Sequence, residues 1–310
     1  MTALDHSRHP KTLGEIRLHE PMAGYTSWRV GGPADRLYRA ADLQDLALFL
    51  EQSSPTEPLF WLGLGSNLLV RDGGIRGTVI ATQGALQNLT REDAHIIRAE
   101  AGVPCAKVAR FAAKHDLCGV EFLAGIPGLM GGALAMNAGA WGGETWDWVQ
   151  AVATLDRHGV LRQRDRTEYT TGYRQVQGPT EECFVAVYLR LESGDGAASL
   201  ARIKQLLERR SQTQPTGVAS CGSVFRNPPG DYAARLIDSA GLKGLQIGGA
   251  CVSTKHANFI INTGSATALD IERLIQQVAA TVQRVHGALL QPEVRIVGEF
   301  GQAGATSDEI

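Results

Sequence analysis

Two short segments, far apart in the chain, each place a reactive side chain beside a residue that shapes the backbone. Ser223 follows Gly222, so its hydroxyl can lie at an exposed corner of the chain. Glu293 follows Pro292, which directs the chain into the strand-like run Val-Arg-Ile-Val. A serine and a glutamate can supply a proton and an electrophilic contact to one substrate if the fold brings them together. Taken singly, the two segments are equally compatible with an ordinary turn and a solvated strand entry.

The segment 62–70 is rich in glycine and follows an apolar run. Its sequence is Leu-Gly-Leu-Gly-Ser-Asn-Leu-Leu-Val, and glycines at this density let backbone N–H groups converge on an anion such as a pyrophosphate. The side chains of Ser66 and Asn67 add donors. The dinucleotide motif G-x-G-x-x-G requires a helix after it, whereas Asn67 precedes a β-like Leu-Leu-Val. We therefore expect a phosphate-binding loop of another type, with a glycine-rich hairpin as the alternative.

A second glycine-rich segment covers residues 121–142. No charged residue lies between Glu121 and Glu144, and almost every residue is small or apolar. Such a segment allows the backbone to approach a flat, largely apolar cofactor closely. Its glycines and proline exclude a membrane span, and a tightly packed, buried helix hairpin is the alternative interpretation.

The composition favours a globular enzyme. A chain of 310 residues is long enough for two or three domains, and its formal charge of -2 gives no indication of nucleic-acid binding. The 5 cysteines form no C-x-x-C pair, which indicates free thiols in a reducing cytosol and no zinc site. The polar first twenty residues or so lack the apolar core of a signal peptide, and no stretch is long and apolar enough for a transmembrane helix. We expect a cytoplasmic protein.

Helices and strands alternate along the chain without internal repeats. The apolar periodicity predicts helices over 42–52 and 104–115, a helix opening at Ser199, and strands over 149–156 and 184–191. The segment 191–196 is typical of a linker. The pair Arg209-Arg210 is expected at the solvated end of the helix that opens at Ser199.

A further long helix is predicted near the C-terminus. Thr267 and Asp270 have the spacing of a capping box, and Gly287 is placed to end the helix. The apolar residues on one face of this helix are expected in the core: Ile271, Leu274, Ile275, Val278, Val282 and Val285.

Taken in order, the motifs of the chain resemble those of the flavin-dependent UDP-N-acetylenolpyruvoylglucosamine reductases (MurB). The match covers roughly residues 20 to 300 in the family's order. The matching segments are 26–34, 63–69, 124–132, 136–140, 172–174, 222–228, 236–238, 241–244 and 292–295.

This resemblance implies an α+β fold with three domains, the first two of which form one cofactor-binding unit. A bilobed FAD-binding unit of the vanillyl-alcohol-oxidase (PCMH) type is followed by a C-terminal α/β substrate-binding domain. The boundaries we expect are 1–85 for the first lobe, 86–198 for the second lobe and 199–296 for the substrate domain, with 297–310 as a candidate extension of the first lobe.

The resemblance also implies the reaction. It is the NADPH-dependent, FAD-mediated reduction of UDP-N-acetylglucosamine enolpyruvate to UDP-N-acetylmuramate in peptidoglycan precursor synthesis. Hydride adds to the terminal carbon of an enol ether, negative charge develops on the conjugated carboxylate, and the neighbouring carbon is protonated. The family pattern assigns Arg174 and Glu293 to the carboxylate and Ser223 to proton donation. Glu293 can help there only as a neutral acid or by orienting another donor, so we expect its pKa to be raised.

Cofactor and substrate positions follow from the same resemblance. Tyr173, Asn227 and Arg295 are the expected substrate contacts, although Arg295 also fits a solvated strand arginine and Tyr173 also fits simple packing. NADPH is the expected hydride donor, and no metal is expected. The residues expected to bind non-covalent FAD are Arg29, Gly31, Gly63, Leu64, Gly65, Ser66, Asn67, Leu68, Gly125, Ile126, Pro127, Gly128, Gly131, Gly132, Asn137, Ala138 and Gly139.

Some features depart from the wider family. The short segments 175–182 and 227–236 resemble the shorter-loop (type II) form. The family has a lysine shortly before the serine motif, but 211–222 contains none, so no residue is assigned to neutralise the pyrophosphate. Two alternatives stay open. One is another flavin oxidase or dehydrogenase of the same cofactor fold that acts on an alcohol or sugar, and the other is a non-enzymatic nucleotide-sugar binding protein.

Overall fold

The first part of the chain builds a four-stranded mixed sheet. The computed structural model describes residues 12–301, and in it β1 pairs antiparallel with β2, while β5 lies parallel to both β2 and β3. α1 (Leu43–Gln52) follows β2, and its N-cap Asp42 accepts a 2.8 Å hydrogen bond from the amide of Asp45, which confirms the predicted helix start. The strand bounds are β1 (Glu15–Pro21), β2 (Pro33–Arg39), β3 (Leu59–Leu62) and β5 (Ile75–Ala81).

A five-stranded antiparallel sheet forms the second part, in the order β12-β11-β15-β7-β6. β11 spans Val149–Asp156 as predicted, and β15 (Glu182–Arg190) contains most of the second predicted strand. α2 (Cys105–Lys114) packs its apolar face on this sheet, with Val108 fully buried. The other strands of the sheet are β6 (Leu89–Arg91), β7 (Ile96–Glu100) and β12 (Leu161–Asp165).

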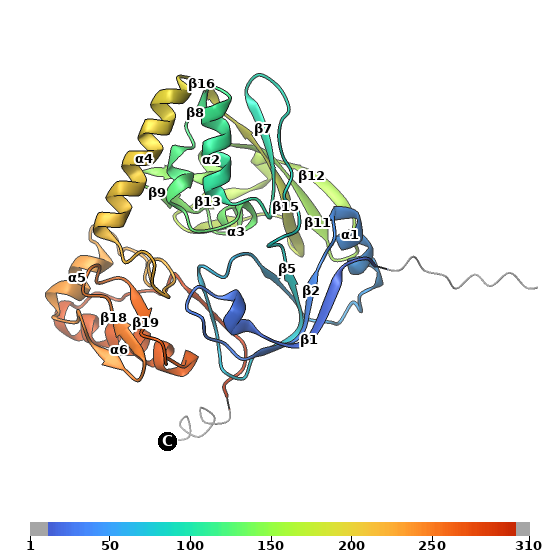
Figure 1. The fold of residues 1–310 in the computed structure, drawn as a ribbon. Coiled ribbons are helices and arrows are strands. Elements are labelled where there is room, and N and C mark those ends of the chain that lie inside the picture. Colours follow the sequence, from blue (N-terminus) through green and yellow to red (C-terminus); the bar gives the residue numbers. More distant parts are fainter. Residues whose placement is uncertain (1–11, 302–310) are drawn as a thin grey trace, which may run out of the picture.

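A long helix, α4 (Gly196–Thr213), runs from the second sheet toward the C-terminal part of the molecule (Figure 1). It begins before the predicted Ser199 because the Asp195 carboxylate accepts hydrogen bonds from the amides of the first turn, at 2.8 and 3.2 Å. The predicted linker 191–196 is not a free connection, since β16 (Glu192–Ser193) pairs with β8 (Leu117–Cys118). That pairing anchors the start of α4 to the second part of the chain.

The C-terminal part combines a small antiparallel sheet, β17-β18-β19, with two helices. In α6 (Ala268–His286), the capping box of Thr267 and Asp270 is present and Gly287 ends the helix at φ 68°, as predicted. Most of the predicted apolar face is buried, but Val285 is 47% exposed, because the last turn of α6 extends beyond the core. The other bounds are α5 (Ala233–Ser239), β17 (Gln246–Ile247), β18 (Ala250–Val252) and β19 (Ile260–Asn262).

The C-terminal part is joined to the first part by a shared core and by polar contacts. Trp28 is fully buried in the C-terminal core, and its Nε1 donates a 2.8 Å hydrogen bond to the carbonyl of Ile260. The carboxylate of Asp72 accepts hydrogen bonds of 3.0 Å from two amides at the start of α6. Arg71 forms a two-point ion pair with Glu272 on that helix.

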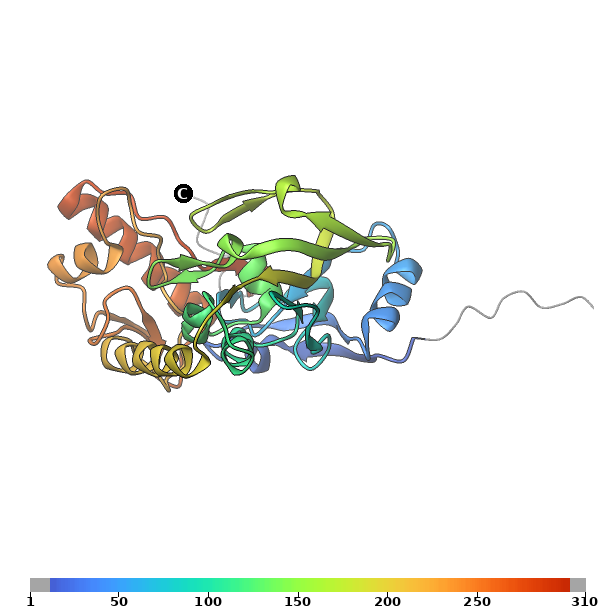
Figure 2. The ribbon, with the colours of Figure 1, turned by 90° about the horizontal axis from the view of Figure 1, so that it is seen from above.

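The end of the chain returns to the first part. β20 (Arg295–Val297) lies parallel to β4 (Leu68–Val70), the strand at the end of the first glycine-rich segment. Seen from above, this C-terminal strand passes beneath the second sheet into the centre of the molecule (Figure 2). Because β20 begins two residues after Glu293, this pairing connects the predicted glutamate to the glycine-rich loop.

The remaining short elements connect these layers. β9 pairs with β10 and β13 pairs with β14. None of the helices within residues 12–301 combines the length and apolar character needed to cross a membrane. The remaining bounds are β9 (Gly139–Ala140), β10 (Gly143–Glu144), β13 (Thr170–Gly172), β14 (Gln175–Gln177), α3 (Met130–Ala135), η1 (Met22–Tyr25), η2 (Glu121–Gly125), η3 (Thr145–Asp147) and η4 (Arg166–Glu168).

Candidate active site

Ser223 lies at a sharp corner that is fixed on both sides. Gly222 adopts φ 20°, and Phe225, two residues after Ser223, exchanges two hydrogen bonds of 2.8 and 2.9 Å with the side chain of Asn258. The Ser223 side chain is half-buried, and its hydroxyl forms no hydrogen bond with any of residues 12–301. The corner therefore presents a hydroxyl that is free to bond a substrate.

Glu293 is brought next to this corner by the backbone. Phe225 and Pro292 form an antiparallel bridge, and the Glu293 amide donates a 2.8 Å hydrogen bond to the carbonyl of Val224. On its other side, the carbonyl of Glu293 accepts a 3.0 Å hydrogen bond from Nδ2 of Asn67. The fold thus brings together the serine and glutamate segments, which are seventy residues apart in the sequence, beside the first glycine-rich loop.

Arg174 reaches the same place from the tip of the β13–β14 hairpin. It occupies a left-handed position at φ 54°, and its Nε donates a 2.9 Å hydrogen bond to Oε1 of Glu293. Its other two nitrogens donate to the carbonyls of Asn137 and Gly139, at 3.3 and 2.9 Å. Three fixed contacts in different directions orient the guanidinium in a way that a lysine could not reproduce.

The electrostatics of Glu293 agree with the expectation for a carboxyl that must hold a proton. Burial raises the pKa of Glu293, and the nearby charges of Arg174 and Arg226 only partly oppose this shift. The predicted direction of the pKa shift is confirmed. A substrate carboxylate that drew Arg174 toward itself would weaken this opposition and favour the neutral acid further.

Arg226 is a site residue that the sequence interpretation did not single out. Its guanidinium donates to the carbonyl of Arg174 at 3.5 Å, and its buried Nε has no hydrogen-bond partner among residues 12–301. Its position inside the run 222–228 was the available signal, because a charged side chain there had to lie close to Ser223.

Both glycine-rich segments contribute to one cavity of about 360 Å³, which we call the glycine-lined cavity. Its walls are mainly apolar, and Arg295 is one of the residues that line it. Of the residues predicted to bind the cofactor, those that line it are Gly63, Leu64, Gly65, Ser66, Asn67, Leu68, Ile126, Gly128, Gly131, Gly132 and Ala138.

The glycines of this cavity fit a bound flat molecule. A Cβ added at Gly132 would meet no protein atom within 4 Å, and one added at Gly128 would meet none closer than 3.7 Å. A side chain at either position would project into space that the protein leaves open, which fits a cofactor at close range. Gly65 is different, because its φ of 59° and the nearby carbonyl of Tyr25 require glycine for the turn itself.

Other residues predicted to bind the cofactor lie outside the glycine-lined cavity. Asn137 is buried and binds Glu144, Trp146 and Gly172, so its side chain holds the second glycine-rich segment in place. Gly31 and Gly125 pack closely against Val70 and Trp141, and Gly139 packs against the backbone of Gly143. Arg29 and Pro127 line a separate cavity.

The predicted substrate residues surround the site at its exposed edge. Tyr173 is 46% exposed, and the Arg174 guanidinium lies 4.9 Å from the centre of its ring. Asn227 is exposed, and its Oδ1 accepts a hydrogen bond from the Ala233 amide at the start of α5. The Arg295 side chain is exposed and forms no ion pair with residues 12–301.

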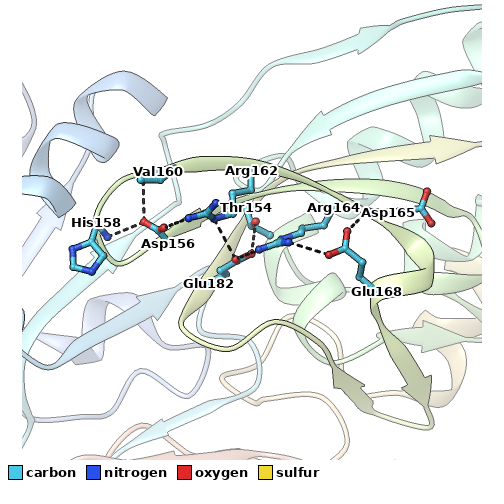
Figure 3. A network of polar contacts seen from close by, with 9 residues as sticks. All are labelled: Thr154, Asp156, His158, Val160, Arg162, Arg164, Asp165, Glu168 and Glu182. Atoms are coloured by element: carbon cyan, nitrogen blue, oxygen red, sulfur yellow. Dashed lines mark hydrogen bonds and ion pairs between the residues drawn. The ribbon is translucent and has the colours of Figure 1, made fainter.

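One wall of the glycine-lined cavity is the start of β15, at Glu182. Figure 3 shows this carboxylate at the centre of an ion-pair network with Arg162 and Arg164 on β12, and with the hydroxyl of Thr154 at 2.6 Å. These contacts hold the pKa of Glu182 below its usual range. The network fixes this part of the cavity wall.

The expectations about cysteines and basic residues meet the structure in different ways. All five cysteines are free thiols, as expected. Within residues 12–301, no group of three or more acidic, histidine or cysteine side chains is arranged to hold a metal ion. The expectation for the Arg209-Arg210 pair is half wrong. Arg209 is exposed, but Arg210 is half-buried and lines a cavity, because α4 continues to Thr213.

Comparisons with known proteins agree with this architecture. Residues 34–163 match the FAD binding domain family, and residues 214–297 match the family described as UDP-N-acetylenolpyruvoylglucosamine reductase, C-terminal domain. A reductase of that name from Alkalilimnicola ehrlichii is 62% identical over 92% of this chain and 96% of its own length. The one from Methylococcus capsulatus is 62% identical over 91% of this chain and 92% of its own length.

A solved structure of a reductase from this family has the same overall fold. The crystal structure of the reductase (MurB) from Thermus caldophilus superposes with a TM-score of 0.78 at 34% sequence identity. The superposition covers 92% of this chain and 99% of that one. Together with the two family matches, it confirms the expected fold class, an FAD-binding unit followed by a C-terminal domain.

Proposed function

Because the chain belongs to the UDP-N-acetylenolpyruvoylglucosamine reductase family, we propose that it reduces UDP-N-acetylglucosamine enolpyruvate to UDP-N-acetylmuramate with NADPH as the electron donor. It is an FAD-dependent oxidoreductase. The observation that carries the proposal is the meeting of Ser223, Glu293 and Arg174 beside the glycine-lined cavity.

Each of these three residues has a separate role in the proposed reaction. When FAD is bound, it supplies the hydride that it has received from NADPH. Arg174 binds the substrate carboxylate and stabilises the negative charge that develops there, with Glu293 as the neighbouring neutral donor. The Ser223 hydroxyl donates the proton to the adjacent carbon. The raised pKa of Glu293 supports its role, because a neutral carboxyl can approach a carboxylate without repulsion.

The remaining assignments are parts of the same proposal. FAD binds non-covalently through the predicted cofactor residues, with the glycine-lined cavity holding it, and Tyr173, Asn227 and Arg295 contact the UDP portion of the substrate. The β13–β14 hairpin has only Tyr173 and Arg174 between its strands, which supports the shorter-loop form.

The domain division and the cellular role belong to the proposal as well. The chain divides at 85, 198 and 296, and its C-terminal strand rejoins the first lobe. The reaction supplies a peptidoglycan precursor in the cytoplasm, and so it serves cell-wall growth, cell shape and division.

The test is anaerobic reduction followed by turnover. Purified protein should carry a flavin absorbance that NADPH bleaches, and the enolpyruvyl substrate should restore it while gaining two hydrogens in mass. Colourless protein would exclude the proposal. Rapid reoxidation by oxygen with no response to the enolpyruvyl substrate would instead indicate an oxidase of the same cofactor fold.

A further inference from the structure

A second cavity, of about 450 Å³, lies beside the serine corner, and we call it the arginine-lined cavity. Gly222 and Ser220 lead directly into Ser223, and both line it. Ser66 and Pro127, one from each glycine-rich segment, form another part of its wall. The cavity therefore opens within a few residues of the proposed proton donor and of both loops that we assign to the flavin.

Two arginines supply the charge of this cavity, and no aspartate or glutamate of residues 12–301 lines it. The Arg29 guanidinium forms no hydrogen bond or ion pair with residues 12–301. Arg210, on the last turns of α4, is half-buried, and within the same residues the only hydrogen bond of its side chain is from Nε to Oε1 of Gln214, at 3.3 Å. Burial lowers the pKa of Arg210, although a guanidinium stays charged at any ordinary pH.

Among residues 12–301 Arg210 has no acidic partner, and this separates it from several other partly buried arginines. Arg71, Arg164 and Arg174 each bind a glutamate. A partly desolvated charge without a counter-ion is unfavourable, and in proteins such groups are usually paired. Two arginines and the hydroxyl-bearing residues Ser66 and Ser220 thus line a space that a polyanion would fill.

We propose that Arg210 and Arg29 form the binding site for the diphosphate of a nucleotide beside the reaction centre. This inference rests on the proposed function, which brings nucleotides with a diphosphate to the serine corner. It also accounts for the absence of lysine from 211–222, because Arg210 provides a cation from the preceding turn of α4. The diphosphate belongs either to an exchangeable nucleotide, such as the UDP of the substrate, or to FAD, and the experiment separates the two.

The test compares Arg210→Gln with Arg209→Gln in the holoenzyme. The two residues are neighbours on α4 and the charge change is the same, but Arg209 is exposed and does not line the cavity. Calorimetric titration with UDP at fixed salt should show Kd raised about 10–100-fold in Arg210→Gln, the effect of losing a charge-assisted hydrogen bond. Arg209→Gln should stay within about two-fold of the natural protein, as expected for a solvated surface charge.

FAD retention, measured in parallel after dialysis, identifies the source of the diphosphate. Weaker UDP binding with full FAD content assigns the site to the exchangeable nucleotide, whereas loss of FAD from Arg210→Gln alone assigns it to the flavin. If Arg210→Gln changes neither UDP affinity nor FAD retention, the proposed diphosphate site is wrong. If Arg210→Gln does not fold, Arg210→Lys keeps the charge, and it should bind UDP with intermediate affinity and a similar salt dependence. If Arg210→Lys binds UDP as tightly as the natural protein, or if its UDP binding does not respond to salt, the proposed diphosphate site is wrong.

These readouts need no turnover, so the two proposals can fail separately. An enzyme that turns over the enolpyruvyl substrate while Arg210→Gln binds UDP and FAD normally would overturn only the diphosphate site. A protein that never turns over this substrate, but whose UDP or FAD affinity depends on Arg210, would overturn only the proposed reaction.

Discussion

Arg174 and Glu293 should act as one unit on the substrate carboxylate, which a double-mutant cycle of Arg174→Lys and Glu293→Gln can measure. The two side chains are only 15% and 11% exposed, and 2.9 Å separates Nε of Arg174 from Oε1 of Glu293. Solvent therefore screens the pair weakly. Because both groups contact one centre, their effects should not be independent.

The size of each single effect follows from the contacts. Arg174 donates three hydrogen bonds in different directions, and one lysine ammonium at the same backbone position can keep about one of them. Losing two charge-assisted bonds, each worth about 1.5 kcal/mol, amounts to roughly 3 kcal/mol, or about a hundred-fold in rate. Glu293→Gln keeps the shape and a donor but cannot change protonation, so it should retain part of the activity if Glu293 acts only as a neutral donor.

The assay is stopped-flow reoxidation of the reduced flavin by the enolpyruvyl substrate. If the two substitutions acted independently, the rate of the double variant would fall by the product of the two single fold-losses. We expect its measured rate to exceed that value by about 5–150-fold, which corresponds to a coupling free energy of about 1–3 kcal/mol. Glu293→Asp is a matched control, since it keeps a titratable carboxyl group but shortens its reach, and it should lose more activity than Glu293→Gln. A double variant whose rate falls by the full product of the two single effects would refute a shared carboxylate site. Single effects that change only KM would refute it as well.

Further predictions concern the cofactor, the pH dependence and the stability. Acid precipitation should release all flavin into the supernatant, because no His or Cys lies in the loop 63–72, and colour in the pellet would contradict non-covalent binding. The oxidative half-reaction should slow as pH rises through the raised pKa of Glu293, where the neutral acid is lost, and Glu293→Gln should abolish that slope. Arg164→Gln should lower the free energy of unfolding by about 1–3 kcal/mol at pH 7, because its partner Glu182 is only 7% exposed. The control Lys204→Gln removes an exposed charge, and it should lower the free energy of unfolding by less than about 0.5 kcal/mol. The pKa of Glu182 is lowered in the folded state. The loss of stability in Arg164→Gln should therefore shrink as pH falls below about 4, because the carboxylate becomes protonated in both the folded and the unfolded state. A loss of stability that does not depend on pH would indicate a packing effect instead.

The sequence predicted most reliably what local rules decide. The start of α1 at Asp42 and both ends of α6 follow from side chains that bind nearby amides and from a glycine with positive φ. The pairing of the serine and glutamate segments does not follow from local rules. It depends on a bridge between Phe225 and Pro292, and it was expected only through the family resemblance.

The wrong expectations share a physical cause. The 3.6-residue period predicts which face of a helix is apolar, but it does not indicate where the core beneath the helix ends, so Val285 was placed inside and Arg210 outside. The segment 191–196 has the composition of a linker, and only its strand partner 117–118 reveals the pairing. In each case the deciding neighbour is distant in the sequence.

The proton donation assigned to Ser223 is the central claim, and Ser223→Ala tests it most directly. The two half-reactions are followed separately by stopped-flow flavin absorbance under anaerobic conditions. Reduction by NADPH should proceed at nearly the natural rate, because hydride delivery to the flavin needs no proton from Ser223. Reoxidation by the enolpyruvyl substrate should slow by about 10²–10⁴-fold or more. Equal loss in both half-reactions, or reoxidation at the natural rate, would contradict the assignment.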